Sequence, residues 1–403
     1  MSRMNSMKEA YAKLTDEQRA EIEEKFAKAD AAQKEFEKWS QEDIDRTIQA
    51  IAWKVANTQT FKELVKMSIE ETNFGDPVSR ENKRFKIRGV LRDALRQKSV
   101  GIIEELPEKG IVKYAKPVGV IACVIPATNP DLTPAGNAIY ALKARNAIIF
   151  SPHPRGVKTG RRTIELMREG LRQVGAPEDL IQILGDTKIN KELSEALNSK
   201  CDLVIATGGQ GVVRRAYHSG TPAYGVGAGN ATMVWDETAR QDLHQAAHNT
   251  MLSKTSDFGS GCSADGNIVI HESIYDDAVK ALEAVGGYLL NEEEQEAVKK
   301  VMWDEHGHRL PNSVAQSPQK MAELAGFSIG DDRKFLVAKG TGSFTEGYED
   351  VWCREKLTTL LAVHKYEGEF QNAIDIVMAI HEVGGVGHSV GIYSYNEDHI
   401  HRL

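Results

Sequence analysis

The chain has 403 residues, of which 41% are hydrophobic and 27% are charged, a balance typical of a soluble globular protein with two domains. Its formal net charge of -8 disfavours nucleic acid and anionic membranes as partners, and no apolar run approaches the length of a membrane span. The four cysteines lie far apart with no CxxC pair, which disfavours a zinc cage or a disulfide framework. We therefore expect a cytoplasmic protein that binds no metal, no nucleic acid and no membrane.

Residues 1 to about 100 are expected to be mostly helical. Thr15 to Gln18 fits a capping box, and Ser40 is a plausible N-cap before an apolar stripe that begins at Ile44. The charged segment from Lys8 to Lys38 is typical of a solvated amphipathic helix. The alternative is a helix that docks on a partner, such as the shell of a microcompartment or a filament.

From Glu104 the pattern changes. Residues 104–110 are expected to form a turn and residues 111–116 a strand. Continuous apolar runs then alternate with helical stretches, which predicts a doubly wound parallel sheet of the Rossmann type. The expected strands are residues 118–125, 147–150, 180–184, 203–206 and 232–235, and the expected helices are 134–144, 156–174 and 209–218.

Two strand ends in this region carry candidate ligand-binding residues. Pro126, Ala127 and Thr128 follow the first strand, and Thr207 with Gly208 and Gly209 follows the fourth. Glycines at the start of a helix allow backbone N–H groups to approach a pyrophosphate. Because the spacing is not GxGxxG, an ordinary turn remains the alternative.

A second α/β unit is expected from about Asp236, which gives domains at 1–235 and 236–403. Cys262 lies in its first part, flanked by Gly261 and Ser263 in a glycine-rich turn. A thiol in such a turn suits a nucleophile, and a small buried hydrophobe is the equally weighted alternative. The other expected elements are a helix at 238–254, a strand near 268, helices from 273 and 292, a looser stretch at 307–347, an apolar run at 357–363 and a helix at 370–383.

With these residues in hand, the sequence resembles the CoA-acylating branch of the aldehyde dehydrogenase superfamily, from about Ser40 to the last residue. The resemblance implies an aldehyde dehydrogenase-like α/β fold, in which a Rossmann-type parallel-sheet cofactor domain is joined to a second α/β catalytic domain. The segments that carry it are Ile125 to Pro130, Lys143 to Arg155, Ala206 to Gly209, Gly225 to Asn230, Cys262, Glu355 to Leu357, and Gly387 with His388.

The resemblance implies that Cys262 attacks an aldehyde and that the Asn129 side chain helps to hold the resulting oxyanion. Hydride transfer would leave a thioester on Cys262. Hydrolytic members carry a glutamate general base where this chain has Gly225, so coenzyme A is the implied acyl acceptor and acyl-CoA the product. The alternatives are a hydrolytic aldehyde dehydrogenase and a noncatalytic structural subunit of a filament or shell-associated complex.

The resemblance also implies a dinucleotide site. Glu355 matches the carboxylate that holds the nicotinamide ribose, and His388 matches a histidine near the mouth of the active site. Arg155 could meet a 2′-phosphate, and the choice between NAD and NADP stays open. The other expected cofactor contacts are Pro126, Ala127, Thr128, Ser151, His153, Thr207, Gly208, Gly209, Val212, Gly225, Val226 and Gly227.

The sequence departs from the branch in places that flank the aldehyde tunnel, at 131–132, 256–258 and 263–265. Acetaldehyde, propionaldehyde and sulfoacetaldehyde therefore all remain candidate substrates. Residues 104–116 resemble part of the family's oligomerisation hairpin, which implies a homo-oligomer, a dimer or larger. The chain is also expected to lack the family's C-terminal tail, since it stops shortly after His388.

Overall fold

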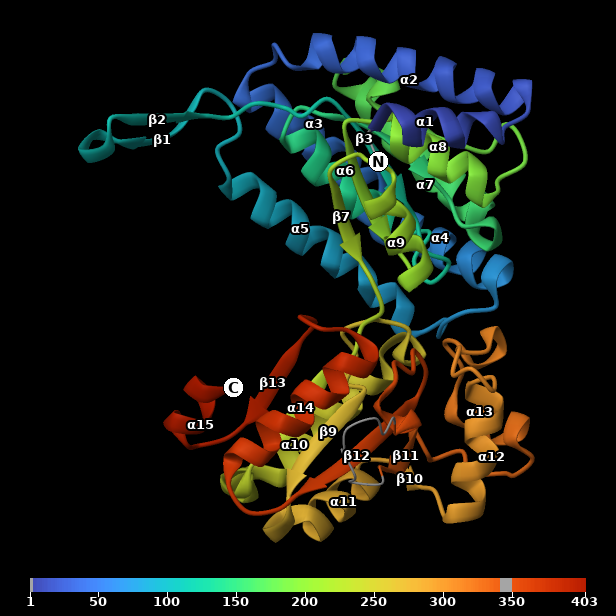
Figure 1. The fold of residues 1–403 in the computed structure, drawn as a ribbon, viewed down its shortest axis with the longest axis vertical. Coiled ribbons are helices and arrows are strands. Elements are labelled where there is room, and N and C mark those ends of the chain that lie inside the picture. The colour runs from blue at the N-terminus through green and yellow to red at the C-terminus, as the bar shows by residue number, and fades with distance from the viewer. Residues whose placement is uncertain (1–2, 341–349) are drawn as a thin grey trace. The chain divides into compact units, whose positions relative to one another are not determined.

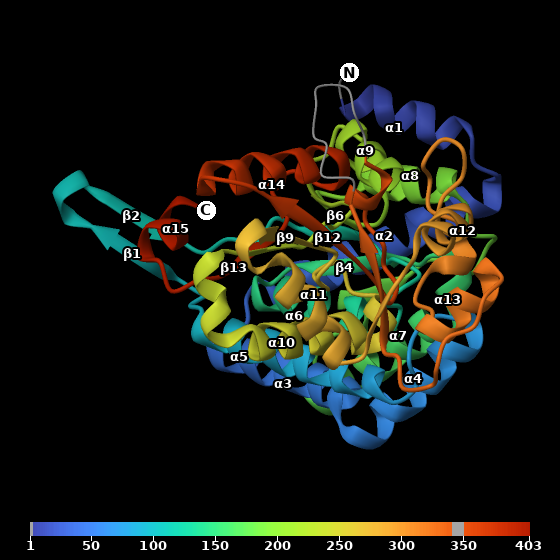
Figure 2. The same cartoon turned by 90° about the horizontal axis from the view of Figure 1, so that it is seen from below.

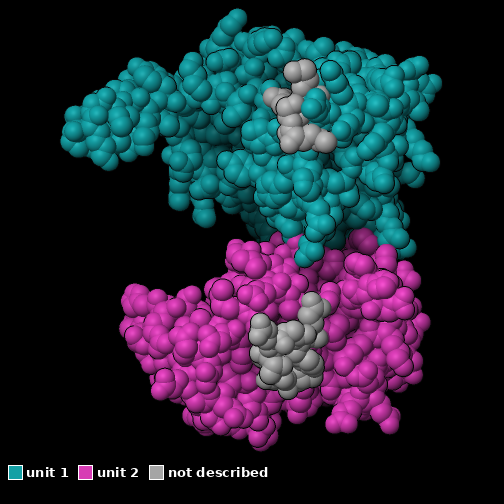
Figure 3. Space-filling view, in the orientation of Figure 1, with its two compact units in different colours: residues 1–73, 81–227 teal, residues 74–80, 228–403 magenta. Residues whose placement is uncertain are grey.

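The computed structural model describes residues 3–340 and 350–403. The chain folds into two compact units, one made of residues 1–73 and 81–227 and the other of residues 74–80 and 228–403 (Figure 3). The second unit thus includes a short segment that comes from far earlier in the chain. Among the described residues, no helix is both long and apolar enough to cross a membrane.

The first unit contains a five-stranded sheet in which every pair of neighbouring strands is parallel. Their order, β5-β4-β3-β6-β7, confirms the expected doubly wound topology, because the chain starts at the central strand and turns back after β5. The strands are β3 (Val120–Val124), β4 (Ala147–Ser151), β5 (Ile181–Ile183), β6 (Leu203–Thr207) and β7 (Ala223–Val226).

Helices cover both faces of this sheet (Figure 1). Right-handed crossovers place the helices of the first two connections on one face and the helix after β5 on the other. The first two pack against α3, whereas the helix after β5 packs against α2. These helices are α2 (Asp16–Phe36), α3 (Gln41–Ala56), α6 (Thr133–Lys143), α7 (Val157–Gln173) and α8 (Lys191–Lys200), while α9 (Gln210–His218) connects β6 to β7.

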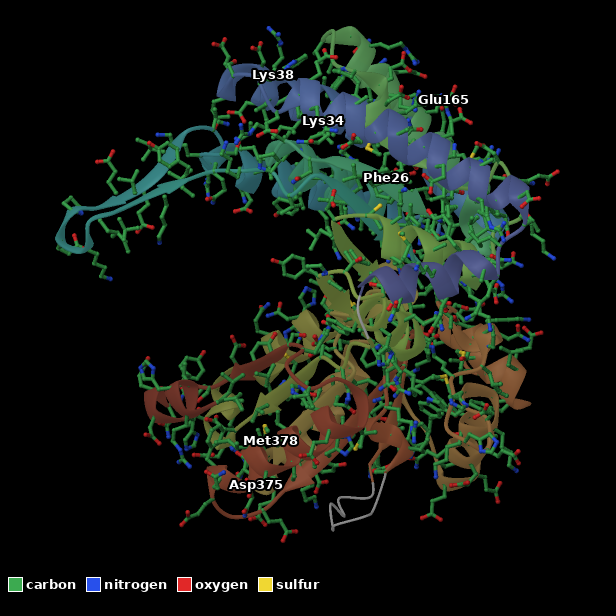
Figure 4. All side chains as sticks on the ribbon, turned by 45° about the horizontal axis from the view of Figure 1, so that its top comes forward. Phe26, Lys34, Lys38, Glu165, Asp375 and Met378 are labelled. Atoms are coloured by element: carbon green, nitrogen blue, oxygen red, sulfur yellow. The ribbon has the colours of Figure 1, made fainter. Side chains whose placement is uncertain are left out.

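The first hundred residues are mostly helical, as expected. The capping box at Thr15 and the N-cap at Ser40 are both confirmed. Helix α2 buries Phe36, while Lys34 is exposed on the helix and Lys38 is exposed just beyond its end (Figure 4). The remaining helices are α1 (Arg3–Ala12), α4 (Thr58–Thr72) and α5 (Arg84–Arg96), with the short 3-10 helix η1 (Ser79–Lys83) before α5.

An antiparallel hairpin follows α5 and consists of β1 (Ile102–Leu106) and β2 (Ile111–Tyr114). The first strand corrects the expectation of a turn from Glu104, because only Pro107–Lys109 and Gly110 reverse the chain. All residues of β2 are exposed. No other strand of the described part of the chain pairs with β1 or β2, so the hairpin presents open strand edges and apolar side chains to solvent.

The second unit contains a six-stranded sheet, ordered β10-β11-β12-β9-β8-β13, in which all neighbours are parallel. The run 232–235 was expected in the first sheet and instead forms β8 of the second, because an apolar run does not reveal which sheet it joins. The strands are β8 (Thr232–Trp235), β9 (Asn267–His271), β10 (Gly287–Leu289), β11 (Phe335–Lys339), β12 (Leu360–Tyr366) and β13 (Val390–Tyr393).

Helices lie on both faces of this sheet (Figure 2). Alternate residues of its strands pack against α10 and α11 on one face, and the intervening residues pack against α12, α13 and α14 on the other. The outer side of α14 carries Asp375 and Met378 (Figure 4). The helices are α10 (Leu243–Thr255), α11 (Tyr275–Ala284), α12 (Glu292–Met302), α13 (Pro318–Ala325), α14 (Phe370–Gly384) and α15 (Glu397–Arg402).

The looser stretch expected at 307–347 is only partly irregular. It contains α13 and β11, which corrects the expectation, and residues 341–347 lie outside the described part of the chain. The expected helix at 238–254 is also split, because a 3-10 turn, Glu237–Asp242, precedes α10.

Candidate active site

Cys262 lies in the turn that joins α10 to β9. Cys262 is exposed, whereas the other three cysteines are buried. The turn is tight because Asp257, Phe258 and Gly259 all adopt left-handed conformations, with φ of 50°, 50° and 65°. Glycine takes such a conformation freely and Asp tolerates it, whereas it strains the backbone at Phe258. The strained turn reverses the chain before Cys262 and presents the thiol at the surface of the second unit.

A buried ion pair holds the beginning of this turn. The Arg80 guanidinium donates to Asp257 Oδ2 at 2.8 Å, and the two side chains are 0% and 1% exposed. The backbone N–H of Asp76 donates to Oδ1 of the same carboxylate at 2.9 Å, and the Ser260 hydroxyl donates to Oδ2. The Asp257 N–H in turn donates to Ser79 Oγ at 2.8 Å. The segment 74–80 therefore fixes the backbone that leads to Cys262.

The end of the turn is held from α10. Ser253 Oγ donates to Asp265 Oδ1 at 2.9 Å and accepts the Asp265 N–H at 3.1 Å, while Lys254 Nζ donates to the Asp265 carbonyl at 3.0 Å. Burial lowers the pKa of Lys254 to about 8, against the opposing charges of Asp265 and Glu355, and burial raises the pKa of Asp265. Cys262 thus lies between two fixed ends.

Gly229 brings three expected site residues of the second unit together. A Cβ at Gly229 would lie 2.8 Å from Cys262 Cβ and 2.9 Å from His388 Nε2, so only a glycine permits their close approach. The Gly229 N–H donates to Glu355 Oε1 at 2.7 Å. Arg309 donates to Oε2 of the same carboxylate at 2.9 Å. Sequence reasoning missed Arg309, because no motif links it to Glu355.

A buried amide network supports this part of the site. Lys356 Nζ donates to Asn267 Oδ1 at 2.8 Å, and Asn267 Nδ2 donates to Asn230 Oδ1 at 2.7 Å. The Asn230 Nδ2 donates to the carbonyl oxygens of Cys353 and Ile380. Burial lowers the pKa of Lys356 to about 7. The network fixes the residues adjoining Glu355 and Gly229.

Three side chains of the kinds that can bind a metal ion also cluster near Lys356. Ligand atoms of Asp350, Cys353 and His364 lie within 4.8 Å of one another, and all three residues are buried. Burial, followed by the Lys356 charge, lowers the pKa of His364 to about 3. A buried lysine therefore lies beside these groups.

In the first unit, the two expected ligand-binding segments follow β3 and β6, the strands on either side of the topological switch point. Open α/β sheets bind ligands at this place. Gly209 is the N-cap of α9, and a Cβ at Gly208 would lie 3.1 Å from the Val212 side chain. The turn therefore holds its backbone against the helix N-terminus, where N–H groups suit a phosphate.

Asn129 lies half-buried at the end of the segment that follows β3. Its Oδ1 accepts a hydrogen bond from Lys83 Nζ at 2.7 Å, and its Nδ2 donates to Thr128 Oγ1 at 3.1 Å. Lys83 was not expected at the site. No sequence signal points to it, because the two residues are 46 positions apart.

The residues expected after β4 differ in exposure. Ser151 Oγ is hydrogen-bonded to Ser194 Oγ of α8 at 2.6 Å, and Ser151 is buried. His153 Nδ1 accepts the Arg155 N–H at 3.1 Å. Loss of hydration and the Arg155 charge lower the pKa of His153. The structure thus uses the Ser151 hydroxyl to join β4 to α8, whereas Arg155 is exposed.

Gly225 occupies a crowded position in β7. A Cβ there would lie 2.5 Å from Val213 Cγ1 and 2.9 Å from the Tyr217 ring. The Gly225 N–H donates to the Tyr217 hydroxyl oxygen at 3.2 Å. A glutamate at this position would have to displace side chains of α9. The side chains of α9 therefore occupy the space that a side chain at position 225 would need.

Comparisons with known proteins identify the family of the chain. The model of the aldehyde dehydrogenase family matches residues 3–301. The chain is 39% identical over 381 residues to a sulfoacetaldehyde dehydrogenase of Acholeplasma sp, covering 93% of this chain and 77% of that protein. It is 39% identical over 388 residues to an acylating sulfoacetaldehyde dehydrogenase of Bilophila wadsworthia, covering 95% and 82%. The solved structure of an acetylating aldehyde dehydrogenase from Geobacillus thermoglucosidasius superposes with a TM-score of 0.88 at 35% identity, covering 96% and 85%.

Proposed function

The chain belongs to the aldehyde dehydrogenase family, and we propose that it oxidises a short-chain aldehyde to an acyl-CoA, with NAD or NADP as the hydride acceptor. The names of its relatives support this assignment, since they include acylating and acetylating enzymes. The exposed Cys262, held beside Glu355 and His388 around Gly229, supplies the nucleophile. Two relatives that are 39% identical act on sulfoacetaldehyde by name, so this aldehyde is the first to test.

In the proposed reaction, the Cys262 thiolate attacks the carbonyl carbon, a C–S bond forms, and the π electrons move to the oxygen. The Asn129 amide donates a hydrogen bond to that oxyanion. A bound nicotinamide supplies the acceptor for the hydride that leaves this carbon as the carbonyl re-forms. The coenzyme A thiolate then attacks the Cys262 thioester, and the Cys262 thiolate departs. The sum is aldehyde, CoA thiol and oxidised cofactor to acyl-CoA, reduced cofactor and one proton.

The single observation that carries the choice of coenzyme A over water is the packing around Gly225. A carboxylate there would activate water, and its absence lowers the hydrolysis rate by about 10²–10⁴-fold. Because even a Cβ would meet Val213 and Tyr217, this chain has no room for that base in its present packing. A thiol, a stronger nucleophile than neutral water, then intercepts the thioester.

For the cofactor, we propose that the backbone at Thr207 to Gly209 holds the pyrophosphate and that Glu355 binds the nicotinamide ribose. The position of Gly209 at the N-terminus of α9 supports the first assignment. The two hydrogen bonds to the Glu355 carboxylate support the second, because they fix its orientation. The exposed Arg155 suits a 2′-phosphate, so NAD and NADP should be compared directly.

We also propose that the hairpin β1–β2 pairs with a second copy of the chain. Support comes from the full exposure of β2, including Ile111 and Tyr114, since an open apolar edge is a template for further pairing. Replacing Ile111 and Tyr114 by lysine should reduce the mass measured by light scattering. An unchanged mass would contradict the proposal.

The test of function is a cofactor-reduction assay with sulfoacetaldehyde, acetaldehyde and propionaldehyde, each with NAD and NADP, and each with and without coenzyme A. We expect sustained turnover only with coenzyme A, and none in Cys262→Ala. A sustained rate that does not depend on coenzyme A would identify a hydrolytic enzyme. A folded wild-type protein that is inactive with all three aldehydes would favour a structural subunit.

A further inference from the structure

The backbone of Asn129 is held in place by its neighbours. The backbone carbonyl oxygen of Asn129 accepts the N–H of Thr133, the first residue of α6, at 3.1 Å. The next residue, Pro130, is buried, and a Cβ at Gly156 would lie 2.9 Å from it. The main chain at Asn129 is therefore held by α6 and by the start of α7. What remains to be set is the rotation of the side-chain amide.

Lys83 sets that rotation. The residue ends η1, is 5% exposed, and donates from Nζ to Asn129 Oδ1 at 2.7 Å. An amide oxygen only accepts hydrogen bonds and an amide nitrogen only donates them. With its oxygen on an ammonium group, the amide must present its nitrogen on the opposite side, where one hydrogen is donated to Thr128 Oγ1 and the second can meet an oxyanion.

The ammonium group also strengthens the donor. A hydrogen bond to the amide oxygen draws electron density from the amide nitrogen, so its N–H becomes a better donor, and burial enhances this effect. The charge is transmitted through the amide, because Lys83 binds the oxygen of Asn129 and the substrate would bind the nitrogen. The benefit grows with the negative charge on the substrate oxygen, which is greatest in the transition state.

We propose that Lys83 is a positioning residue that orients and polarises the Asn129 amide for the oxyanion formed when Cys262 attacks the aldehyde. The inference rests on the proposed function. Removing one oxyanion donor typically lowers kcat by about 10²–10³-fold. Removing the residue that orients the donor should lower kcat by about 10–100-fold, as a fraction of that effect. The aldehyde KM should change little, because the ground-state carbonyl oxygen carries little charge.

The test is a double-mutant cycle with Lys83→Met, Asn129→Ala and their combination, measured as kcat and KM with coenzyme A and the best aldehyde. If Lys83 acts through Asn129, the double variant is no slower than Asn129→Ala. Lys86→Met, an exposed lysine on the following turn, is the matched control and should leave kcat unchanged. Alkylation of Cys262 by iodoacetamide forms no carbonyl oxyanion, so its rate should be equal in Lys83→Met and wild type.

Two results would overturn the proposal while leaving the function intact. One is a CoA-dependent wild-type enzyme with the same kcat as Lys83→Met. The other is a double variant slowed by the full product of the two single effects, which would show independent roles. If Lys83→Met does not fold, Lys83→Gln keeps a neutral donor and should give an intermediate kcat. An inactive wild-type protein would instead refute the proposed function itself.

Discussion

Replacing Arg80 by methionine should destabilise the second unit more than any exposed charge change can. The guanidinium and the Asp257 carboxylate are 2.8 Å apart and almost completely buried. Methionine is unbranched and fills most of the space of the arginine stem, so the substitution removes the charge with little loss of packing. It leaves a carboxylate buried without its cation.

Breaking a buried ion pair by removing one partner lowers the free energy of unfolding by about 3–5 kcal/mol. The structure favours the lower end of this range, because the carboxylate retains the Asp76 N–H and the Ser260 hydroxyl as donors. We therefore expect a loss of about 3 kcal/mol in Arg80→Met. Adding Asp257→Asn removes the stranded charge and keeps a residue that tolerates the left-handed conformation, so the double variant should regain part of that loss.

The assay is urea unfolding followed by tryptophan fluorescence, since Trp235, Trp303 and Trp352 all lie in the second unit. Lys320→Met, which breaks an exposed i,i+3 pair with Glu323, is the matched control and should change stability by less than about 1 kcal/mol. If Arg80→Met were no less stable than this control, the buried pair would not hold the nucleophile turn and the reasoning would be wrong.

Three further substitutions test the site. Gly225→Ala should lower the free energy of unfolding by about 1–3 kcal/mol through overpacking. Gly211→Ala is the control and should cause no such loss, because its Cβ would meet its nearest neighbour only at 3.5 Å. Equal thermal midpoints of the two variants would contradict this prediction. Gly229→Ala should slow CoA-dependent turnover by about 10²-fold by displacing Cys262, and an unchanged kcat would exclude the contact. Burial lowers the pKa of Lys254 to about 8. Between about pH 8 and about pH 10 the unfolded chain therefore binds more protons than the folded one. The free energy of unfolding should rise with pH over this range by at most about 1.4 kcal/mol per pH unit. Urea titrations of Lys254→Met should lack this part of the rise.

The sequence predicted four of the five strands of the first sheet and the helices α6, α7 and α9, because their signals are local, but it predicted neither β7 nor α8. Apolar runs mark β3 to β6, and the side chains of Thr15 and Ser40 cap the helices that follow them. The doubly wound order also places the segments after β3 and β6 at the switch point. Sheet membership is not local, however, and β8 was assigned to the wrong sheet for that reason.

The residues that the sequence could not predict act over long separations. Arg80 and Asp257 are 177 positions apart, and Arg309 and Glu355 are 46 apart. Neither pair lies in a motif with a fixed spacing. A charged residue in a polar stretch is usually solvated, so its sequence context gave no reason to expect Arg80 in a buried pair. Only the fold shows which carboxylate it meets.

The discontinuous second unit limits how the chain can be divided. A fragment that begins at Ala228 would carry Cys262 but not the segment 74–80, and the turn before the thiol would lose its bonds to Arg80, Ser79 and the Asp76 backbone. Splitting the gene at that boundary would therefore not yield two self-sufficient halves. A functional split would need to graft the early segment onto the later fragment or supply it as a peptide.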